Sequence, residues 1–182
     1  MKEVAVKFAQ LTDRRCIGVK GPDAASWLNQ QAVLVPDRAN SWTPLSADES
    51  DLVARLGHSE FLIDRGSSAI MNDEFEKISS LSVDGVYPVL RQDACFELSG
   101  IDAHDVLAQV CNVNFAEVPI AERHAVMTMM IGVAVTVVPQ GNAAQPRYRI
   151  WCDPSFGDYL GGSLQQIVNE SSGGWREHQN SG

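Results

Sequence analysis

The stretch Cys16–Leu28, CIGVKGPDAASWL, recurs in related form as Cys95–Leu107, CFELSGIDAHDVL. Cysteine, glycine, aspartate, alanine and leucine occupy matching positions in the two copies. Each copy begins with the apolar residues of a strand, reaches a glycine, and continues with the i, i+3, i+4 apolar spacing of a helix. The sequence therefore predicts two structural repeats, each built around one strand-to-helix corner.

Local signals predict where the helix of each copy begins. In the first copy we expect Gly21 at the N-cap and Pro22 at the first helical position. In the second copy Ser99 and Asp102 have the spacing of a weak capping box. Neither copy has the further glycines or the Lys-Ser/Thr pair of a phosphate-binding loop. We therefore interpret both corners as scaffold.

The same patterns along the chain predict an α+β fold of two pseudo-symmetric halves, each ordered strand-strand-helix-strand-strand-helix, with mostly antiparallel sheets. Residues 1–170 form a single domain in this interpretation, with repeats at about 1–82 and 83–170, followed by a polar C-terminal tail over 171–182. The segment 32–50 is interpreted as an irregular connection. Strands are predicted over 4–8, 15–20, 52–56, 60–64, 86–91, 95–98, 125–130, 133–138 and 147–152, and helices over 22–31, 71–80, 101–110 and 154–168.

Composition excludes several classes of function. The chain has 182 residues, is 45% hydrophobic and 20% charged, and carries a net charge of −9. This charge argues against nucleic acid or an anionic membrane as the main partner, because both require basic patches. The apolar run Met129–Pro139 is too short to span a bilayer, and we expect a cytoplasmic protein. The four cysteines form no C-x-x-C pair, so we expect free thiols and no metal site.

Three groups of residues together carry a family resemblance. They are the two Gly-x-Asp-Ala corners, the strand Glu60–Ile63, and the stretch Ser155–Leu160, SFGDYL. With them, the chain resembles the gamma subunit of heterotetrameric sarcosine oxidase, which is related to the folate-binding aminomethyltransferase (glycine-cleavage T-protein) fold. The likeness runs from about Leu11 to Val168. It departs after Tyr-Leu, where relatives tend to carry an aromatic residue and this chain has Gly161-Gly162.

The resemblance implies a non-catalytic gamma-type subunit. Such a complex demethylates sarcosine oxidatively to glycine and passes the one-carbon unit to tetrahydrofolate. The resemblance places FAD, FMN, NAD and tetrahydrofolate on partner subunits, none of them on this chain, and implies alpha, beta and delta subunits as partners. A stand-alone folate-binding or one-carbon-transfer protein is the alternative. A third reading, the folate-binding proteins of iron–sulfur maturation, ranks last because their Lys-Gly-Cys-Tyr-x-Gly-Gln motif is absent.

Aromatic residues are the candidate contacts for partner subunits. Trp42 and Trp175 lie in polar stretches of sequence, so we expect exposed rings that anchor an interface, where aromatics are enriched. Tyr159, in the SFGDYL stretch, is the third candidate interface residue. The sequence predicts no catalytic residue.

Other chemically interesting residues have structural interpretations. Arg14-Arg15 is interpreted as a solvated strand start, and His124 as a surface or satisfied histidine. The alternation of Met127, Met129 and Met130 predicts core packing along a strand. A further pair, Arg147 and Arg149, shares one side of a strand and is expected to face solvent or a partner.

Overall fold

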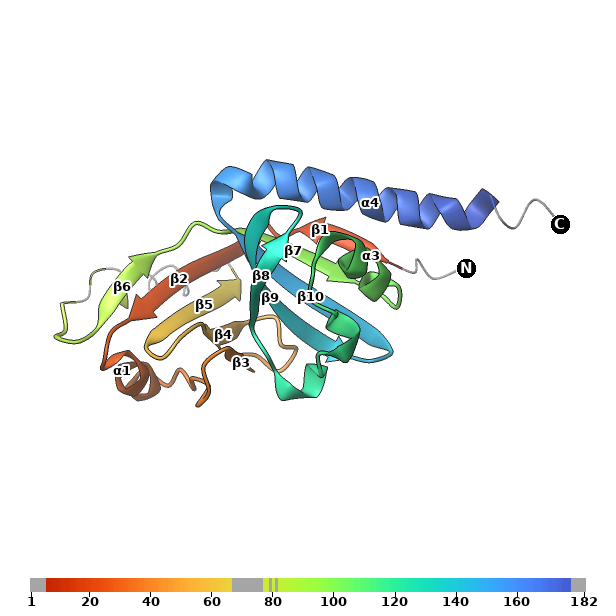
Figure 1. Cartoon of the computed structure of the whole chain (residues 1–182). Helices are drawn as coiled ribbons and strands as arrows, with labels where there is room; N and C mark the ends of the chain where they lie inside the picture. Colours follow the sequence, from red (N-terminus) through yellow and green to blue (C-terminus); the bar gives the residue numbers. More distant parts are fainter. Residues whose placement is uncertain (1–5, 67–76, 79, 81, 178–182) are drawn as a thin grey trace. The chain divides into compact units, whose positions relative to one another are not determined.

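Both predicted strand-to-helix corners are present in the computed structural model (Figure 1). The glycine of each corner has a positive φ, 129° at Gly21 and 117° at Gly100, which side chains other than hydrogen disfavour. The amide of Ala24 donates to the Gly21 carbonyl at 3.1 Å, and that of Ala103 donates to the Gly100 carbonyl, also at 3.1 Å. The two copies therefore enter their helices through the same backbone geometry.

The structure describes residues 6–66, 77, 78, 80 and 82–177, with side chains up to Ser171 in the last helix. The strands are β1 (Lys7–Gln10), β2 (Arg14–Lys20), β3 (Ser41–Pro44), β4 (Leu52–Arg55), β5 (Glu60–Gly66), β6 (Tyr87–Leu90), β7 (Ala94–Ser99), β8 (Val126–Met130), β9 (Val133–Asn142) and β10 (Gln145–Cys152). The α-helices are α1 (Ala24–Gln30), α3 (Ala103–Val110) and α4 (Gly157–Glu177), and short 3-10 helices cover Phe115–Glu117, Ile120–Glu122 and Pro154–Phe156. The helix predicted over 71–80 lies largely outside the described residues.

The described strands form two five-stranded sheets. One, called here the β7 sheet, has the order β1-β7-β10-β9-β8, and the other, the β2 sheet, has the order β3-β4-β5-β2-β6. Every strand pair with a defined register is antiparallel. The predicted α+β class with antiparallel sheets is confirmed.

The chain groups into two compact units. One comprises 1–11, 94–121 and 127–182 and contains the β7 sheet, whereas the other comprises 12–93 and 122–126 and contains the β2 sheet. β1 belongs to the first unit because it pairs along β7, with Lys7 opposite Ser99. Each unit thus combines segments that are distant in the sequence.

The unit of the β2 sheet is held by one apolar cluster. Leu28 of α1 is fully buried in it, and Trp27 packs against its edge, as the apolar stripe of this helix predicts. The fully or largely buried members of the cluster come from α1, β2, β4 and β5, from the segment after α1, and from the segment before β6: Ile17, Val19, Ala24, Leu28, Val33, Val35, Val53, Phe61, Ile63, Ile78 and Val86.

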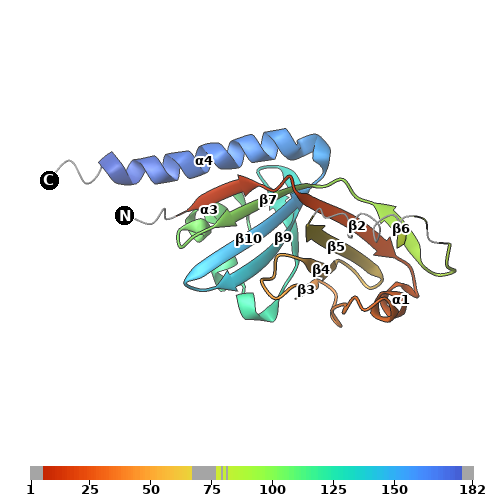
Figure 2. The ribbon, with the colours of Figure 1, turned by 180° about the vertical axis from the view of Figure 1, so that it is seen from behind.

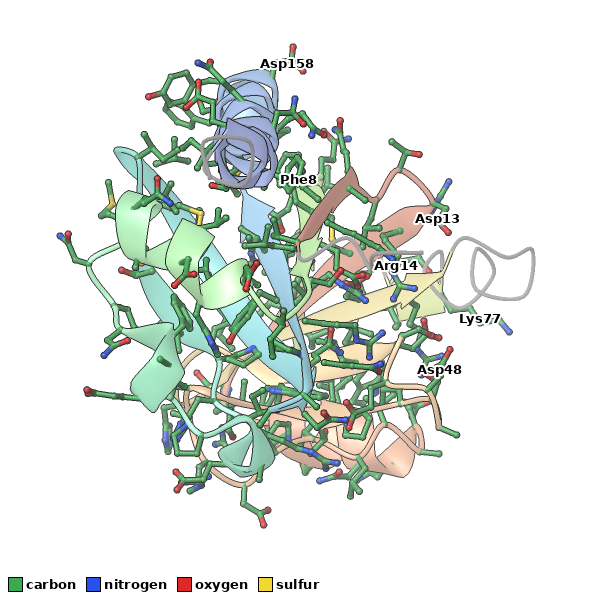
Figure 3. The ribbon with its side chains drawn as sticks, turned by 90° about the vertical axis from the view of Figure 1, so that its right-hand side faces the viewer. Phe8, Asp13, Arg14, Asp48, Lys77 and Asp158 are labelled. Atoms are coloured by element: carbon green, nitrogen blue, oxygen red, sulfur yellow. The ribbon has the colours of Figure 1, made fainter. Side chains whose placement is uncertain are left out.

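The unit of the β7 sheet is covered by α4, which runs along β1 and β7 (Figures 1 and 2). Phe8 of β1 and Phe96 of β7 stack with ring centroids 5.6 Å apart. Figure 3 shows Phe8 beneath this helix and Asp158, at its start, pointing away from the sheet. The buried Leu160 and Leu164 lie four residues apart on one face of α4, which is the spacing that an amphipathic helix requires.

Two sequence-based assignments were wrong. The segment 32–50 contains β3, because β4 supplies a partner strand with Trp42 opposite Ala54. The helix α4 continues to Glu177 instead of ending near Val168. Side-chain hydrogen bonds one turn apart support this extension, Gln165 to Asn169 at 3.0 Å and Gln166 to Glu170 at 2.9 Å.

The predicted helix caps were also wrong in detail. Asp23 and Asp102 occupy the N-cap positions of α1 and α3, and neither side chain makes a capping hydrogen bond. The carbonyls of Gly21 and Gly100 accept the amides of the first helical residues instead. The capping box expected between Ser99 and Asp102 is therefore not formed.

Candidate functional site

The start of α4 presents two exposed aromatic rings. Phe156 and Tyr159 are 49% and 54% exposed, and their spacing of three residues places them on one side of the chain. Asp153 fixes this turn because its Oδ1 accepts a hydrogen bond from the Ser155 amide at 2.9 Å. The hydroxyl of Ser155, and then its amide, lower the pKa of Asp153 below its usual range. The turn that directs both rings outward is therefore held by a charged cap.

The edge strand β8 adds two methionines to this region. Met127 and Met129 are 54% and 50% exposed, whereas Met130 is fully buried. The prediction that all three pack in the core was wrong, because alternation on an edge strand leaves one face without a covering layer. The hydroxyl of Tyr159 donates to the carbonyl of Ile131, directly after β8, at 3.3 Å. We call Met127, Met129, Phe156 and Tyr159 the methionine–aromatic surface.

The predicted exposure of Trp42 was wrong. Its side chain is 2% exposed, and the Arg123 guanidinium lies over its ring at 5.4 Å from the centroid. The Trp42 amide donates to the Arg123 carbonyl at 2.9 Å, so both the main chain and the ring of Trp42 contact Arg123. Trp175 lies in α4, and its side chain is outside the described residues. Of the three candidate interface residues, Tyr159 is the one with a described, exposed ring.

Arg14 belongs to a buried ion-pair network and does not form a solvated strand start. Its side chain is 8% exposed, with Nε 2.9 Å from the fully buried carboxylate of Asp64 and Nη2 3.0 Å from Asp51 (Figure 3). Burial acts to lower the pKa of Arg14, but the charges and hydrogen bonds of Asp64 and Asp51 raise it overall. The neighbouring Arg15 is exposed, as the sequence predicted. This network has a structural function.

The arginine pair of β10 divides between two environments. Arg149 is 3% exposed, and its Nη2 lies 3.7 Å from Glu97 on β7. Arg147 is half-buried and lines a pocket at the end of the β7 sheet. The expectation that both face solvent or a partner was therefore wrong for Arg149, because the neighbouring strand supplies a carboxylate.

Two histidines have polar partners that are relevant to proton transfer. The hydroxyl of Tyr148 is hydrogen-bonded to Nε2 of His104, and burial raises the pKa of Tyr148 to about 12. Tyr148 therefore keeps its proton at neutral pH and is a poor base there. Nε2 of His124 lies 2.7 Å from the carboxylate of Glu122, which is two residues away in the sequence. Each histidine is thus hydrogen-bonded through Nε2 within the protein.

The described part of the chain offers neither a metal site nor a membrane-spanning helix. There, no group of three or more histidine, cysteine, aspartate or glutamate side chains is placed to hold a metal ion. No helix among these residues has the length and apolar character needed to cross a bilayer. Cys95 and Cys152 are buried, Cys16 and Cys111 are half-buried, and none of these four described cysteines forms a disulfide.

Comparisons with known proteins give the fold. No family model and no curated protein matches the sequence. A chain of the heterotetrameric sarcosine oxidase from Corynebacterium sp. U-96, solved with pyrrole 2-carboxylate, is 18% identical and superimposes with a TM-score of 0.72, covering 94% of this chain and 88% of that one. The glycine cleavage system aminomethyltransferase T from Bartonella henselae is 16% identical, with a TM-score of 0.64 over 88% of this chain.

This chain has the fold of both proteins. It spans 45% of the length of the aminomethyltransferase T chain, so this chain corresponds to part of that longer protein. The aminomethyltransferase-like fold that the resemblance implied is confirmed.

Proposed function

We propose that this chain is a non-catalytic, gamma-type subunit of a sarcosine-oxidase-like flavoenzyme complex in the cytoplasm. The observation that carries the proposal is the two-way coverage: 94% of this chain corresponds to 88% of a chain from a heterotetrameric sarcosine oxidase. Such coverage is expected when two chains are equivalent subunits over their whole lengths. In this proposal FAD, FMN, NAD and tetrahydrofolate bind to partner subunits, and this chain stabilises the assembly.

The methionine–aromatic surface supports an assembly function. Methionine and aromatic side chains are enriched in the buried centres of protein interfaces. Four such side chains, each about half exposed, lie on one unit of this chain: Met127, Met129, Phe156 and Tyr159. We propose that this surface contacts another subunit of the complex, and that Trp175 extends the contact along α4.

Co-expression tests the proposed subunit function. The full chain is produced with the alpha, beta and delta subunits of a sarcosine-oxidase-like complex from the same source, and the mixture is separated by size-exclusion chromatography. We expect the chain to co-elute with the three partners and its omission to lower the yield of assembled complex. Elution of the chain alone, at every ratio of subunits, contradicts the proposal.

A stand-alone folate-binding or one-carbon-transfer protein is the second candidate. The likeness to aminomethyltransferase T over 88% of this chain favours it. Titration of the isolated chain with tetrahydrofolate in a calorimeter separates the two candidates. Saturable heat at micromolar ligand supports the second candidate, and no heat at millimolar ligand excludes it.

A further inference from the structure

The five residues of β8 include three methionines, and the sheet divides them between two environments. Met127 and Met129 are 54% and 50% exposed, whereas Met130 is fully buried. β8 is an edge strand of the β7 sheet, and residues two apart on a strand project from the same face at a separation of roughly 7 Å. Two thioethers therefore share an open face, and a third lies in the core directly after them.

Backbone contacts at the end of β8 fix this division. The amide of Ile131 donates to the Val110 carbonyl at 2.9 Å, and the hydroxyl of Tyr159 donates to the Ile131 carbonyl at 3.3 Å. Cys111, after α3, forms an isolated antiparallel bridge with Met130. All of these residues belong to one compact unit. Because they hold Met130 in the core, the alternation of the strand keeps the other two methionines in solvent.

Exposed thioethers react with peroxides. A lone pair of the sulfur attacks one oxygen of hydrogen peroxide, the O–O bond breaks, and the methionine becomes a sulfoxide while the second oxygen leaves as water. The sulfur loses the two electrons that the peroxide gains. Since exposure governs this reaction, Met127 and Met129 are the reactive methionines of β8, and Met130 is protected by burial.

Oxidation of this pair changes two of the four members of the methionine–aromatic surface. A sulfoxide oxygen is a polar acceptor, and burying it without a donor costs free energy. The hydroxyl of Tyr159 already donates to the Ile131 carbonyl, so it is occupied within the chain. The oxidised surface is therefore better solvated by water than by an apolar partner, whereas the packing of Met130 in the core is unchanged.

We propose that Met127 and Met129 form a paired site of reversible oxidation by hydroperoxides, and that the sulfoxide form binds another subunit weakly. The first part concerns one compact unit alone, and the second part rests on the proposed subunit function. Methionine sulfoxide reductases reverse the step: the sulfoxide oxygen leaves as water, and two thiols of the reductant become a disulfide. Assembly buries the pair and protects it from further oxidation.

Peptide mass spectrometry of the isolated full chain tests the first part. The folded chain is treated with hydrogen peroxide and digested with trypsin, which releases His124–Arg147 with all three methionines of β8 in one peptide. We expect Met127 and Met129 to gain oxygen at least about tenfold faster than Met130, because reactivity follows exposure. In urea the three rates should become equal. Equal rates in the folded chain would overturn the assignment.

Surface plasmon resonance with the assembled partner subunits tests the second part. Peroxide treatment should lower the affinity of the chain at least about tenfold, since polar groups replace apolar ones at an interface. Treatment with methionine sulfoxide reductases and dithiothreitol should restore the affinity. The double variant Met127→Gln/Met129→Gln, which mimics the polarity of the sulfoxides, should bind weakly without peroxide.

The double variant Met127→Leu/Met129→Leu separates methionine oxidation from cysteine oxidation. Whatever its starting affinity, this variant should bind equally well before and after peroxide treatment. An equal loss in the leucine variant, or unchanged affinity of the oxidised wild type, overturns the second part. Failure of the untreated chain to bind would contradict the proposed function and this second part together, and the peptide measurement would still decide the first part.

Discussion

Two neighbouring arginines show how burial decides the function of a residue. Arg14 and Arg15 are adjacent on β2, where successive side chains point to opposite faces of the sheet. Arg14 is directed to the buried carboxylate of Asp64, whereas Arg15 remains in solvent. The same residue type therefore stabilises the fold at Arg14 and contributes little to the free energy of unfolding at Arg15.

Replacement of Arg14 should strongly destabilise the protein. Arg14→Met removes the ion pair between the Arg14 guanidinium and the fully buried Asp64 carboxylate, and we expect the free energy of unfolding to fall by roughly 3 to 5 kcal/mol. Urea unfolding followed by circular dichroism measures the loss. Arg15→Met is the control and should change stability by less than about 1 kcal/mol. Equal losses in the two variants would contradict the buried network.

The buried Tyr148 predicts a loss of stability at high pH. Burial raises its pKa in the folded state from 10.0 to about 12. The folded state therefore holds the phenol proton more tightly than the unfolded state does. The resulting stabilisation is complete below pH 10 and is lost as pH rises through 12, an effect of roughly 2 to 3 kcal/mol.

Ultraviolet absorbance of tyrosinate checks this prediction. The difference between wild type and Tyr148→Phe should show a folded-state ionisation near pH 12, and the high-pH decline in stability should be smaller in the variant. Tyr159→Phe, at an exposed ring, serves as control. A Tyr148 signal with its midpoint at the ordinary tyrosine pKa in folded protein would falsify the assignment.

Candidate site residues were difficult to predict from residue type. Trp42 was expected to be exposed and is buried, whereas Met127 and Met129 were expected to be buried and are exposed. Periodicity shows that alternate residues of a strand share a face, but it does not show whether that face is covered. The exposed position of β8 at the edge of its sheet decided the outcome for the methionines.

At the scale of the element, the glycine pair of α4 gives a matched test of packing. A Cβ on Gly161 would lie 2.9 Å from the fully buried ring of Phe96, whereas a Cβ on Gly162 would meet no atom within 4 Å. We expect Gly162→Ala to raise the free energy of unfolding by about 1 kcal/mol through helix propensity. Gly161→Ala should lower it by roughly 1 kcal/mol, because overpacking exceeds that gain.

Thermal unfolding of the two alanine variants provides the measurement. Opposite shifts in melting temperature support the close packing of α4 on β7. Stabilisation by both substitutions would show that the helix does not approach Phe96 so closely. Gly161 permits this contact because it has no Cβ.

Elements with strong local signals were predicted well. The strand β2 and the helix α3 follow the apolar periodicity within two residues at each end. The strand β3 was missed because its four residues contain serine, threonine and proline, and its formation depends on the partner strand β4. The length of α4 was underestimated because glycine and serine have low helix propensity.

At the scale of the whole molecule, the methionine–aromatic surface predicts a defect in assembly without loss of folding. The double variant Met129→Ser/Tyr159→Ser removes two half-exposed apolar side chains, so monomer stability should change little. Partner affinity should fall at least thirtyfold, which corresponds to roughly 2 kcal/mol for the loss of an interface anchor. Size-exclusion co-elution and surface plasmon resonance with the partner subunits measure this loss.

Leu90→Ser is the matched control, because Leu90 is 81% exposed on β6, outside the methionine–aromatic surface. This variant should assemble as the wild type does. Assembly defects of equal size in the double variant and the control would indicate that the surface has no special function. Undisturbed assembly of the double variant would direct the search to another face.

The sequence by itself determined the two strand-to-helix corners and the α+β class, and its motifs carried the resemblance to the aminomethyltransferase-like fold. The corners and the class follow from local physics, namely apolar periodicity and a glycine at each corner. Only the tertiary structure decided which side chains are exposed and that Lys7, Ser99 and Arg147 form one row. Such neighbours come from strand pairing between distant segments, and the free energy of that pairing depends on the whole packed unit.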